Sequence, residues 1–214
     1  MGQQLGLFEQ PPETTAFETI EAARAAARDC QRCDLAATRR KVVFGEGGVR
    51  PPLMIVGEGP SEADDAGGHP FRGPSGRLLE RWLEALGLDR ERVWLTNVVR
   101  CRAAQLDGAR LRNRPPRAAE MQACRLWMDT ECALVRPRLV LCVGATAARA
   151  LVGREFKMTR DRGRWLSLVD GTPALATYNP AYVLRLEDTA REEAEWQVST
   201  DLASVRERLE SDAS

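Results

Sequence analysis

The sequence predicts an α/β protein: a three-layer α/β/α domain with a central, mainly parallel four-stranded sheet. Short apolar runs beginning at Leu53, Arg92, Arg138 and Pro173 alternate with segments of helical periodicity. Runs that are apolar throughout are typical of parallel strands buried on both faces. Strands that alternate with helices favour a parallel sheet covered on both sides. At 214 residues the chain is long enough to enclose one core of this kind.

The expected elements follow in chain order. A helix rich in alanine, glutamate and arginine is predicted over Phe17–Asp29, then a short extended piece over Lys41–Phe44. The first core strand, Leu53–Val56, leads into a loop that carries Glu62, Asp64 and Asp65. The remaining elements are helix Ser75–Leu86, a strand from Arg92 ending in Asn97, a basic loop Arg100–Arg117, helix Arg117–Leu134, strand Arg138–Val143, helix Ala147–Leu151, an irregular strand around Trp165–Val169 and strand Pro173–Tyr178.

Three regions are expected along the chain. Residues 1–17 are predicted to be a flexible leader, residues 18–185 the globular domain, and residues 186–214 a charged helix packed on that domain. No apolar run approaches the ~20 residues of a membrane span, so no membrane contact is expected. The amino terminus lacks the basic start and apolar stretch of a secretory signal, which predicts a cytoplasmic protein. The formal net charge of zero neither predicts nor excludes nucleic acid, because binding depends on a local basic face.

The stretch Leu53–Leu79 carries the first chemical signal. Glycines, acidic residues and a single phenylalanine, Phe71, follow the first strand. Such a loop at the carboxyl end of a strand describes a pocket in an α/β sheet. The alternative is an ordinary loop with solvated carboxylates.

Cysteines carry a second, separate signal. Cys30 and Cys33 form a C-x-x-C motif, and Cys101 and Cys124 flank the basic loop, so folding can bring the four together. Four thiolates suit either zinc or an iron–sulfur cluster, and spacing does not decide between them. The alternative is that these residues are core thiols and the C-x-x-C is incidental or redox-active.

Several motifs occur together in a fixed order along the chain. They are Gly57-Glu58-Gly59-Pro60 with Asp64-Asp65, Pro70-Phe71-x-Gly73, Gly76-x-Leu78-Leu79, Thr96-Asn97-Val98-Val99-Arg100-Cys101-Arg102, Asn113-Arg114-x-Pro116 with Glu120 and Cys124, Arg136-Pro137, Gly144-Ala145, and Thr177 to Arg185. With these motifs the chain resembles the family 4 uracil-DNA glycosylases, the iron–sulfur members of the uracil-DNA glycosylase superfamily. The resemblance covers residues 29–185.

The resemblance implies a [4Fe-4S] cluster, rather than zinc, on Cys30, Cys33, Cys101 and Cys124. It also implies a pocket for a uracil flipped out of DNA. In that pocket Glu58 and the Gly59 backbone form the lining, Phe71 stacks on the base, and Asn97 reads its edge through one donor and one acceptor.

Catalysis is implied at Asp64, which matches the family's carboxylate for the attacking water and the cationic sugar, and at Asn179. The family usually has histidine at the second position and glutamate at the first. An asparagine still donates a hydrogen bond but polarises less, so a slow enzyme or a shifted base preference is expected. DNA contacts are expected from Arg185, Leu184, Arg112 and Arg114.

Taken together, the sequence predicts a monofunctional DNA glycosylase that excises uracil from DNA and starts base excision repair. Its partner is uracil-containing DNA, and it acts as a monomer near the nucleoid. The alternatives are a catalytically weak protein that binds DNA lesions and a glycosylase for another deaminated base.

Overall fold

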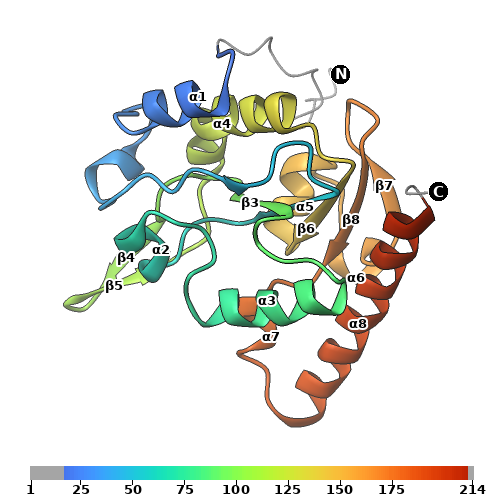
Figure 1. The fold of residues 1–214 in the computed structure, drawn as a ribbon. Coiled ribbons are helices and arrows are strands. Elements are labelled where there is room, and N and C mark those ends of the chain that lie inside the picture. Colours follow the sequence, from blue (N-terminus) through green and yellow to red (C-terminus); the bar gives the residue numbers. More distant parts are fainter. Residues whose placement is uncertain (1–16, 212–214) are drawn as a thin grey trace, which may run out of the picture.

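A central sheet separates two layers of helices (Figure 1). The computed structural model describes residues 17–211. The leader predicted for residues 1–17 therefore lies, except for Phe17, outside the described residues. Within the described part the sheet has six strands in the order β1-β3-β2-β6-β8-β7.

The middle of the sheet is parallel and its edges are antiparallel. The strands are β1 (Glu46–Gly47), β2 (Leu53–Gly57), β3 (Val93–Asn97), β6 (Leu139–Val143), β7 (Trp165–Ser167) and β8 (Pro173–Thr177). The predicted three-layer class and the four parallel strands are confirmed. The count of four strands for the sheet was wrong. β7 lies within the irregular strand expected around Trp165–Val169 and joins the sheet as an edge strand, whereas β1, of two residues, lacks a buried apolar run and was not predicted.

Alternate side chains along each core strand pack against opposite helix layers. On β2, Met54 and Val56 belong to one buried cluster, and Leu53 and Ile55 belong to the other. The first cluster is covered by α1 (Ile20–Ala27), α4 (Ala118–Val135) and α5 (Ala145–Leu151). The second is covered by α3 (Pro74–Ala85), α7 (Pro180–Val183) and α8 (Asp188–Ser211). Burial on both faces explains why the central strands β2 and β6 read as uninterrupted apolar runs.

Short elements account for most differences from the predicted order. The acidic loop after β2 contains helix α2 (Glu62–Gly67), which begins with a capping box between Ser61 and Asp64. The basic loop contains a hairpin of β4 (Ala104–Asp107) and β5 (Arg110–Asn113). The extended piece predicted over Lys41–Phe44 is not a strand; pairing begins two residues later, in β1. A 3₁₀ turn (Asp34–Ala37) and helix α6 (Met158–Asp161) complete the connections.

The charged carboxyl-terminal helix α8 packs on the domain by one stripe. Val198, Leu202 and Val205 of α8 are buried, whereas Trp196 is 68% exposed. Among the described residues, no helix combines the length and the apolar character needed to cross a membrane.

A buried ion pair lies inside the first cluster. Arg100 and Glu131 are 1% and 0% exposed, and the Arg100 Nε donates to Glu131 Oε1 at 2.9 Å. The other donors to the Glu131 carboxylate are the Trp94 indole N–H at 2.9 Å and the Gly45 backbone N–H at 3.0 Å. A buried charge is stable only when it is paired and hydrogen-bonded in this way.

Removal of this carboxylate is expected to destabilise the fold strongly. Glu131→Ala leaves the Arg100 charge buried and unpaired, which typically lowers the free energy of unfolding by about 3–5 kcal/mol. Urea denaturation measures the loss. The control is Glu207→Ala on the exposed side of α8, where a change within about 0.5 kcal/mol is expected. An equal effect of the two substitutions would contradict the role given to the buried pair.

Candidate active site

A cavity of about 480 Å³ lies at the carboxyl edge of the sheet. Residues that follow all four parallel strands contribute to it. Those predicted from the sequence are Glu58, Gly59, Asp64, Phe71, Asn97, Arg114, Asn179 and Arg185. The same edge of an open α/β sheet is where ligands commonly bind.

Two glycines make room for the side chains at the floor of the cavity. A Cβ on Gly57 would lie 2.4 Å from the Asn97 Oδ1 and 2.7 Å from the Phe71 Cζ. A Cβ on Gly144 would lie 3.1 Å from the Asn179 Cβ. Gly57 ends β2 and Gly144 follows β6, the neighbouring parallel strand. Phe71, Asn97 and Asn179 therefore converge on one hollow.

Phe71 is held in an unusual backbone conformation. Its φ of 57° lies in the left-handed region, which is uncommon for a bulky residue. The Arg90 guanidinium donates to the carbonyls of Pro70 at 2.6 Å and Phe71 at 3.2 Å. Any Cβ on Gly76 would overlap the Phe71 carbonyl oxygen. Held conformations of this kind are concentrated at ligand sites, where they fix the orientation of a side chain.

Asp64 is a buried carboxylate that fastens the same loop. Its Oδ2 accepts the Ser61 N–H at 2.8 Å and its Oδ1 accepts the Arg72 N–H at 2.6 Å. The side chain reaches the cavity although the residue is only 4% exposed. Each carboxylate oxygen has a second lone pair, so the group can still face a ligand or water.

Asn97 and Asn179 present amides to the cavity. Asn97 is 2% exposed, and no other group among the described residues hydrogen-bonds to its side chain. The Asn179 Oδ1 accepts the Ala181 N–H at 2.8 Å and caps α7. Because that oxygen is engaged, the Asn179 NH₂ is left as a donor to the cavity.

The side chains predicted to contact DNA differ in their exposure and in whether they already have partners. Arg185 is exposed at the rim and has no side-chain partner in the described part of the chain. Arg114 is held by Glu120, and its hydrogen bond keeps the pKa of that carboxyl below its usual range. Arg112 lies outside the cavity and pairs with Asp107 at 2.6 Å. Leu184 is partly buried against the second core cluster.

The four predicted ligand cysteines lie near one another, beside α1 and α4. Burial raises the pKa of Cys101 to about 12 and that of Cys124 to about 11, and repulsion from neighbouring thiolates adds to both. Within residues 17–211, no three His, Cys, Asp or Glu side chains form a group suited to a single metal ion.

N–H groups point at all four of these sulfurs. The Cys30 Sγ accepts from the Trp127 indole at 3.4 Å, and the Cys124 Sγ accepts from the Arg100 backbone at 3.3 Å. An Arg39 N–H lies 3.8 Å from the Cys101 Sγ, and the Leu35 backbone N–H bonds to Cys33. Hydrogen bonds of this kind stabilise metal-bound thiolates and tune iron–sulfur centres, so the surroundings fit such a group.

Comparison with known proteins decides the family. The model of the uracil DNA glycosylase superfamily matches residues 44–203. The chain is 34% identical to the type-4 uracil-DNA glycosylase of Thermotoga maritima over 80% of its own length and 86% of the relative's. For the type-4 enzyme of Saccharolobus solfataricus the identity is 35%, over 77% and 80% of the two chains.

The chain belongs to the type-4 uracil-DNA glycosylases. A third relative, the type-4 enzyme of Pyrobaculum aerophilum, is 34% identical over 74% of this chain and 81% of its own. Several of the residues that carried the resemblance in the sequence line the cavity, among them Glu58, Asp64, Phe71, Asn97 and Asn179.

For this type-4 uracil-DNA glycosylase, sequence reasoning missed several residues of the cavity. The Thr146 hydroxyl donates to the Glu58 carboxylate, and Ser61, Ser75 and Asn113 add polar lining. Thr146 could have been predicted as a lining residue, because it follows β6, whose carboxyl end lies at the same edge of the sheet. Ser61 precedes α2 and Ser75 is the second residue of α3, and a single sequence does not reveal that the starts of these two helices meet at the cavity.

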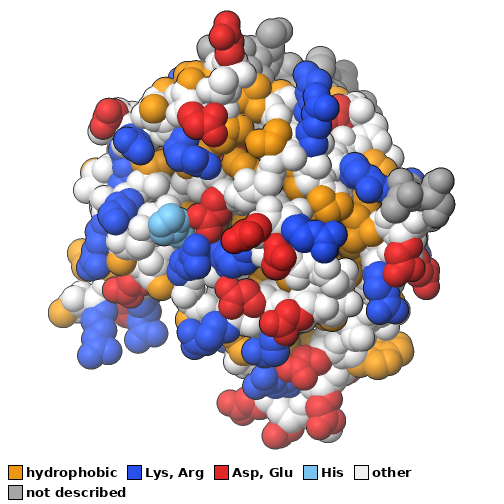
Figure 2. Space-filling view, in the orientation of Figure 1, with side chains coloured by type: hydrophobic (Ala, Val, Ile, Leu, Met, Phe, Trp, Pro, Cys, Tyr) orange, Lys and Arg blue, Asp and Glu red, His pale blue; other side chains and the backbone are white. Residues whose placement is uncertain are grey.

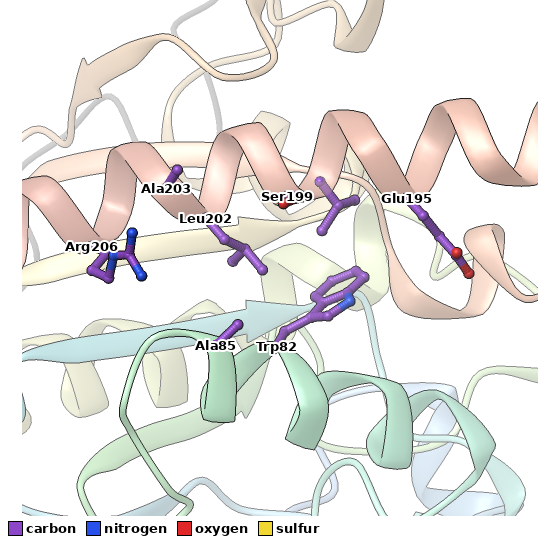
Figure 3. Close-up of a pocket in the computed structure, with 8 residues that line it drawn as sticks. Trp82, Ala85, Glu195, Ser199, Leu202, Ala203 and Arg206 are labelled. Atoms are coloured by element: carbon purple, nitrogen blue, oxygen red, sulfur yellow. The ribbon is translucent and has the colours of Figure 1, made fainter.

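A smaller hollow of about 240 Å³ lies between α3 and α8 (Figure 3). Trp82 and Ala85 of α3 face Leu202 and neighbouring residues of α8 across it (Figure 3). None of the residues predicted to do chemistry lines this hollow. It is a packing gap between two helices.

Adding a methyl group at the cavity floor is expected to disable the site. Gly57→Ala places a Cβ against Asn97 and Phe71. Displacement of such groups by about 1 Å can cost about 100-fold in activity. Steady-state assays on uracil-containing DNA measure the loss. Gly67→Ala is the control, since a Cβ there meets nothing within 4 Å. Full activity of Gly57→Ala would refute the proposed floor.

Proposed function

We propose that the protein hydrolyses the N-glycosidic bond of a deoxyuridine flipped out of DNA, the first step of base excision repair. The observation that carries the proposal is the convergence of Phe71, Asn97, Asn179 and Asp64 on one cavity. The chain acts as a monomer inside the cell, a setting that suits its six free cysteines.

Recognition of the base is assigned to Phe71 and Asn97. The Phe71 ring supplies face-on stacking, which holds any planar base. The Asn97 amide offers one donor and one acceptor to the O4/N3 edge of uracil, whereas cytosine presents the opposite pattern. The burial of Asn97 makes the choice strict, because a wrong base leaves a desolvated amide unpaired.

Bond cleavage is assigned to Asn179 and Asp64. As the bond breaks, negative charge builds on the base and positive charge on the sugar. The Asn179 NH₂, oriented by the Ala181 contact, donates to uracil O2. The Asp64 carboxylate stabilises the cationic sugar and holds the attacking water. Among the described residues that line the cavity none is a lysine, so a Schiff base with the sugar is not expected.

Contacts to DNA are assigned to the rim. Arg185 binds a phosphate beside the flipped nucleotide, with Leu184 next to it, and Arg112 and Arg114 extend the basic surface. These residues position the duplex and carry no base identity.

A [4Fe-4S] cluster is assigned to Cys30, Cys33, Cys101 and Cys124. Such a group takes four thiolates, and the neighbouring thiols of these cysteines would supply them. Bound there, it supplies a rigid crosslink between α1, the segment after β3 and α4. We assign it no step of the reaction.

Replacement of Asn179 separates its role as the cap of α7 from its proposed role as a hydrogen-bond donor to the base. Asn179→Ser keeps an oxygen able to cap α7 but is too short to reach the base. We expect stability close to wild type and excision slower by about 10²–10³-fold. Asn179→His retains a longer donor and is expected to be at least as fast as wild type. Alkaline cleavage of abasic product reports the rates on U:G, U:A and single-stranded oligonucleotides.

Asp64→Asn in the same assay tests the role of the carboxylate. Wild-type excision by Asn179→Ser would remove the donor role. Absence of abasic product from the wild type on all three substrates would favour a protein that binds lesions without cleaving them. Product from a different deaminated base would redirect the specificity.

The cluster is tested by metal content. Purified protein is expected to be brown and to hold about four irons with matching sulfide per chain. A zinc protein would be colourless. Cys124→Ser should lose iron and colour, whereas Cys132→Ser, outside the four, should keep both. Iron retained at the wild-type level in Cys124→Ser would overturn the ligand assignment.

A further inference from the structure

The β4–β5 hairpin presents two chemically different faces. Its register pairs Leu106 with Leu111 and Ala104 with Asn113. Because side chains alternate along a strand, these four residues share one face. Gln105, Asp107, Arg110 and Arg112 share the other, where Arg112 pairs with Asp107.

The leucine pair has no place in the protein core. Leu106 is 74% exposed and Leu111 44%, and neither belongs to a core cluster. Two leucines paired across an exposed hairpin form an apolar patch that no residue of the described range 17–211 covers. Hydrophobic side chains and basic side chains lie together at this corner of the surface (Figure 2). An exposed apolar patch beside basic side chains is more often a binding surface than a chance consequence of packing.

The hairpin rises from the rim of the cavity. Asn113, the last residue of β5, lines the cavity and shares the face of the leucine pair. Arg102 holds the base of the hairpin: it donates to Asn113 Oδ1 at 2.7 Å and to the Leu111 carbonyl at 3.1 Å. Four residues per strand carry the tip about 13 Å beyond that rim. Figure 1 shows the hairpin projecting from the body beside α2.

The charges of the hairpin match a polyanion. Arg110 has no partner among the described residues, and Arg112 is 69% exposed despite its ion pair. Arg114 and Arg185 continue the basic rim at the cavity. A nearby basic rim and an apolar ridge form the combination by which proteins open a base step in DNA.

Resting on the proposed function, we propose that Leu106 and Leu111 form a wedge that enters duplex DNA beside the flipped nucleotide. The pair fills the space left in the base stack, while Arg110 and Arg112 bind the flanking phosphates. Leu184, another of the expected DNA contacts, is partly buried against the core and has less apolar surface to offer than the hairpin pair. A wedge is needed only in a duplex, because an unpaired strand has no stack to open.

The test compares duplex with single-stranded DNA. Leu106→Ser/Leu111→Ser is expected to lose roughly 10- to 100-fold in kcat/KM on duplex U:A, the worth of burying one or two leucine side chains. On a single-stranded oligonucleotide the change should stay within about 2-fold, since no stack is opened. The conservative Leu106→Met/Leu111→Met variant should retain duplex activity. Val169→Ser, a 50%-exposed valine on the β7–β8 turn, is the matched control and should change neither.

A second readout does not depend on excision. In a duplex with 2-aminopurine beside a tetrahydrofuran abasic analogue, insertion of the wedge unstacks the fluorescent base and raises its emission. Wild type and the methionine variant should raise it, and the serine variant should not. Equal emission and equal duplex-to-single-strand ratios for wild type and serine variant would overturn the wedge. Emission without product from any uracil substrate would keep the wedge and refute the proposed excision.

Discussion

The arrangement of the site depends on the buried pair of Arg100 and Glu131. The Arg100 side chain donates to the Asn97 carbonyl and to Glu131, and its backbone N–H donates to the Cys124 sulfur. Arg100 thus touches the end of β3, the core of α4 and one of the four neighbouring thiols. Its charge is tolerated inside the protein only because Glu131 lies against it. Arg100 therefore fixes the backbone carbonyl of Asn97, which leaves the side-chain amide oriented toward the cavity.

Through Arg100 the group of four cysteines is linked, at Cys124, to the residue at the end of β3. Asn97 and Cys101 are separated by three residues, all of them buried. In the proposed assignment, a cluster held by Cys101 and Cys124 would restrain the segment that follows β3, and with it the side-chain amide of Asn97. The pre-organisation of a recognition group lowers the entropy lost when substrate binds. A cluster in that position would act on specificity through the position of Asn97, without touching substrate.

Much of the fold could be predicted because its signals are local. A strand buried on both faces must be apolar throughout, and β2 and β6 show this plainly. Edge strands of two or three residues carry no such run, and hairpin β4–β5 is exposed on both strands, so its composition resembles a loop. The class and the parallel core follow from the sequence, whereas the sheet's size depends on pairings that only the tertiary structure makes.

At the site, the sequence predicts which residue types are present better than it predicts what each side chain does. Asp64 reads as a reactive carboxylate, yet both of its oxygens accept backbone N–H groups that close the Phe71 loop. The left-handed φ of Phe71 and its support by Arg90 depend on contacts nineteen and twenty residues apart. Thr146 acts on Glu58 from 88 positions away. Such long-range contacts leave no periodicity for a single sequence to reveal.

The two short edge strands bear on how the molecule behaves in a crowded solution. A long, straight outer strand is a template on which another polypeptide can extend the sheet, the route to aggregation and amyloid. Here β1 offers two residues and β7 three. With so little backbone open at either of its edges, the central sheet is a poor template for edge-to-edge pairing between copies of the protein, even at high concentration.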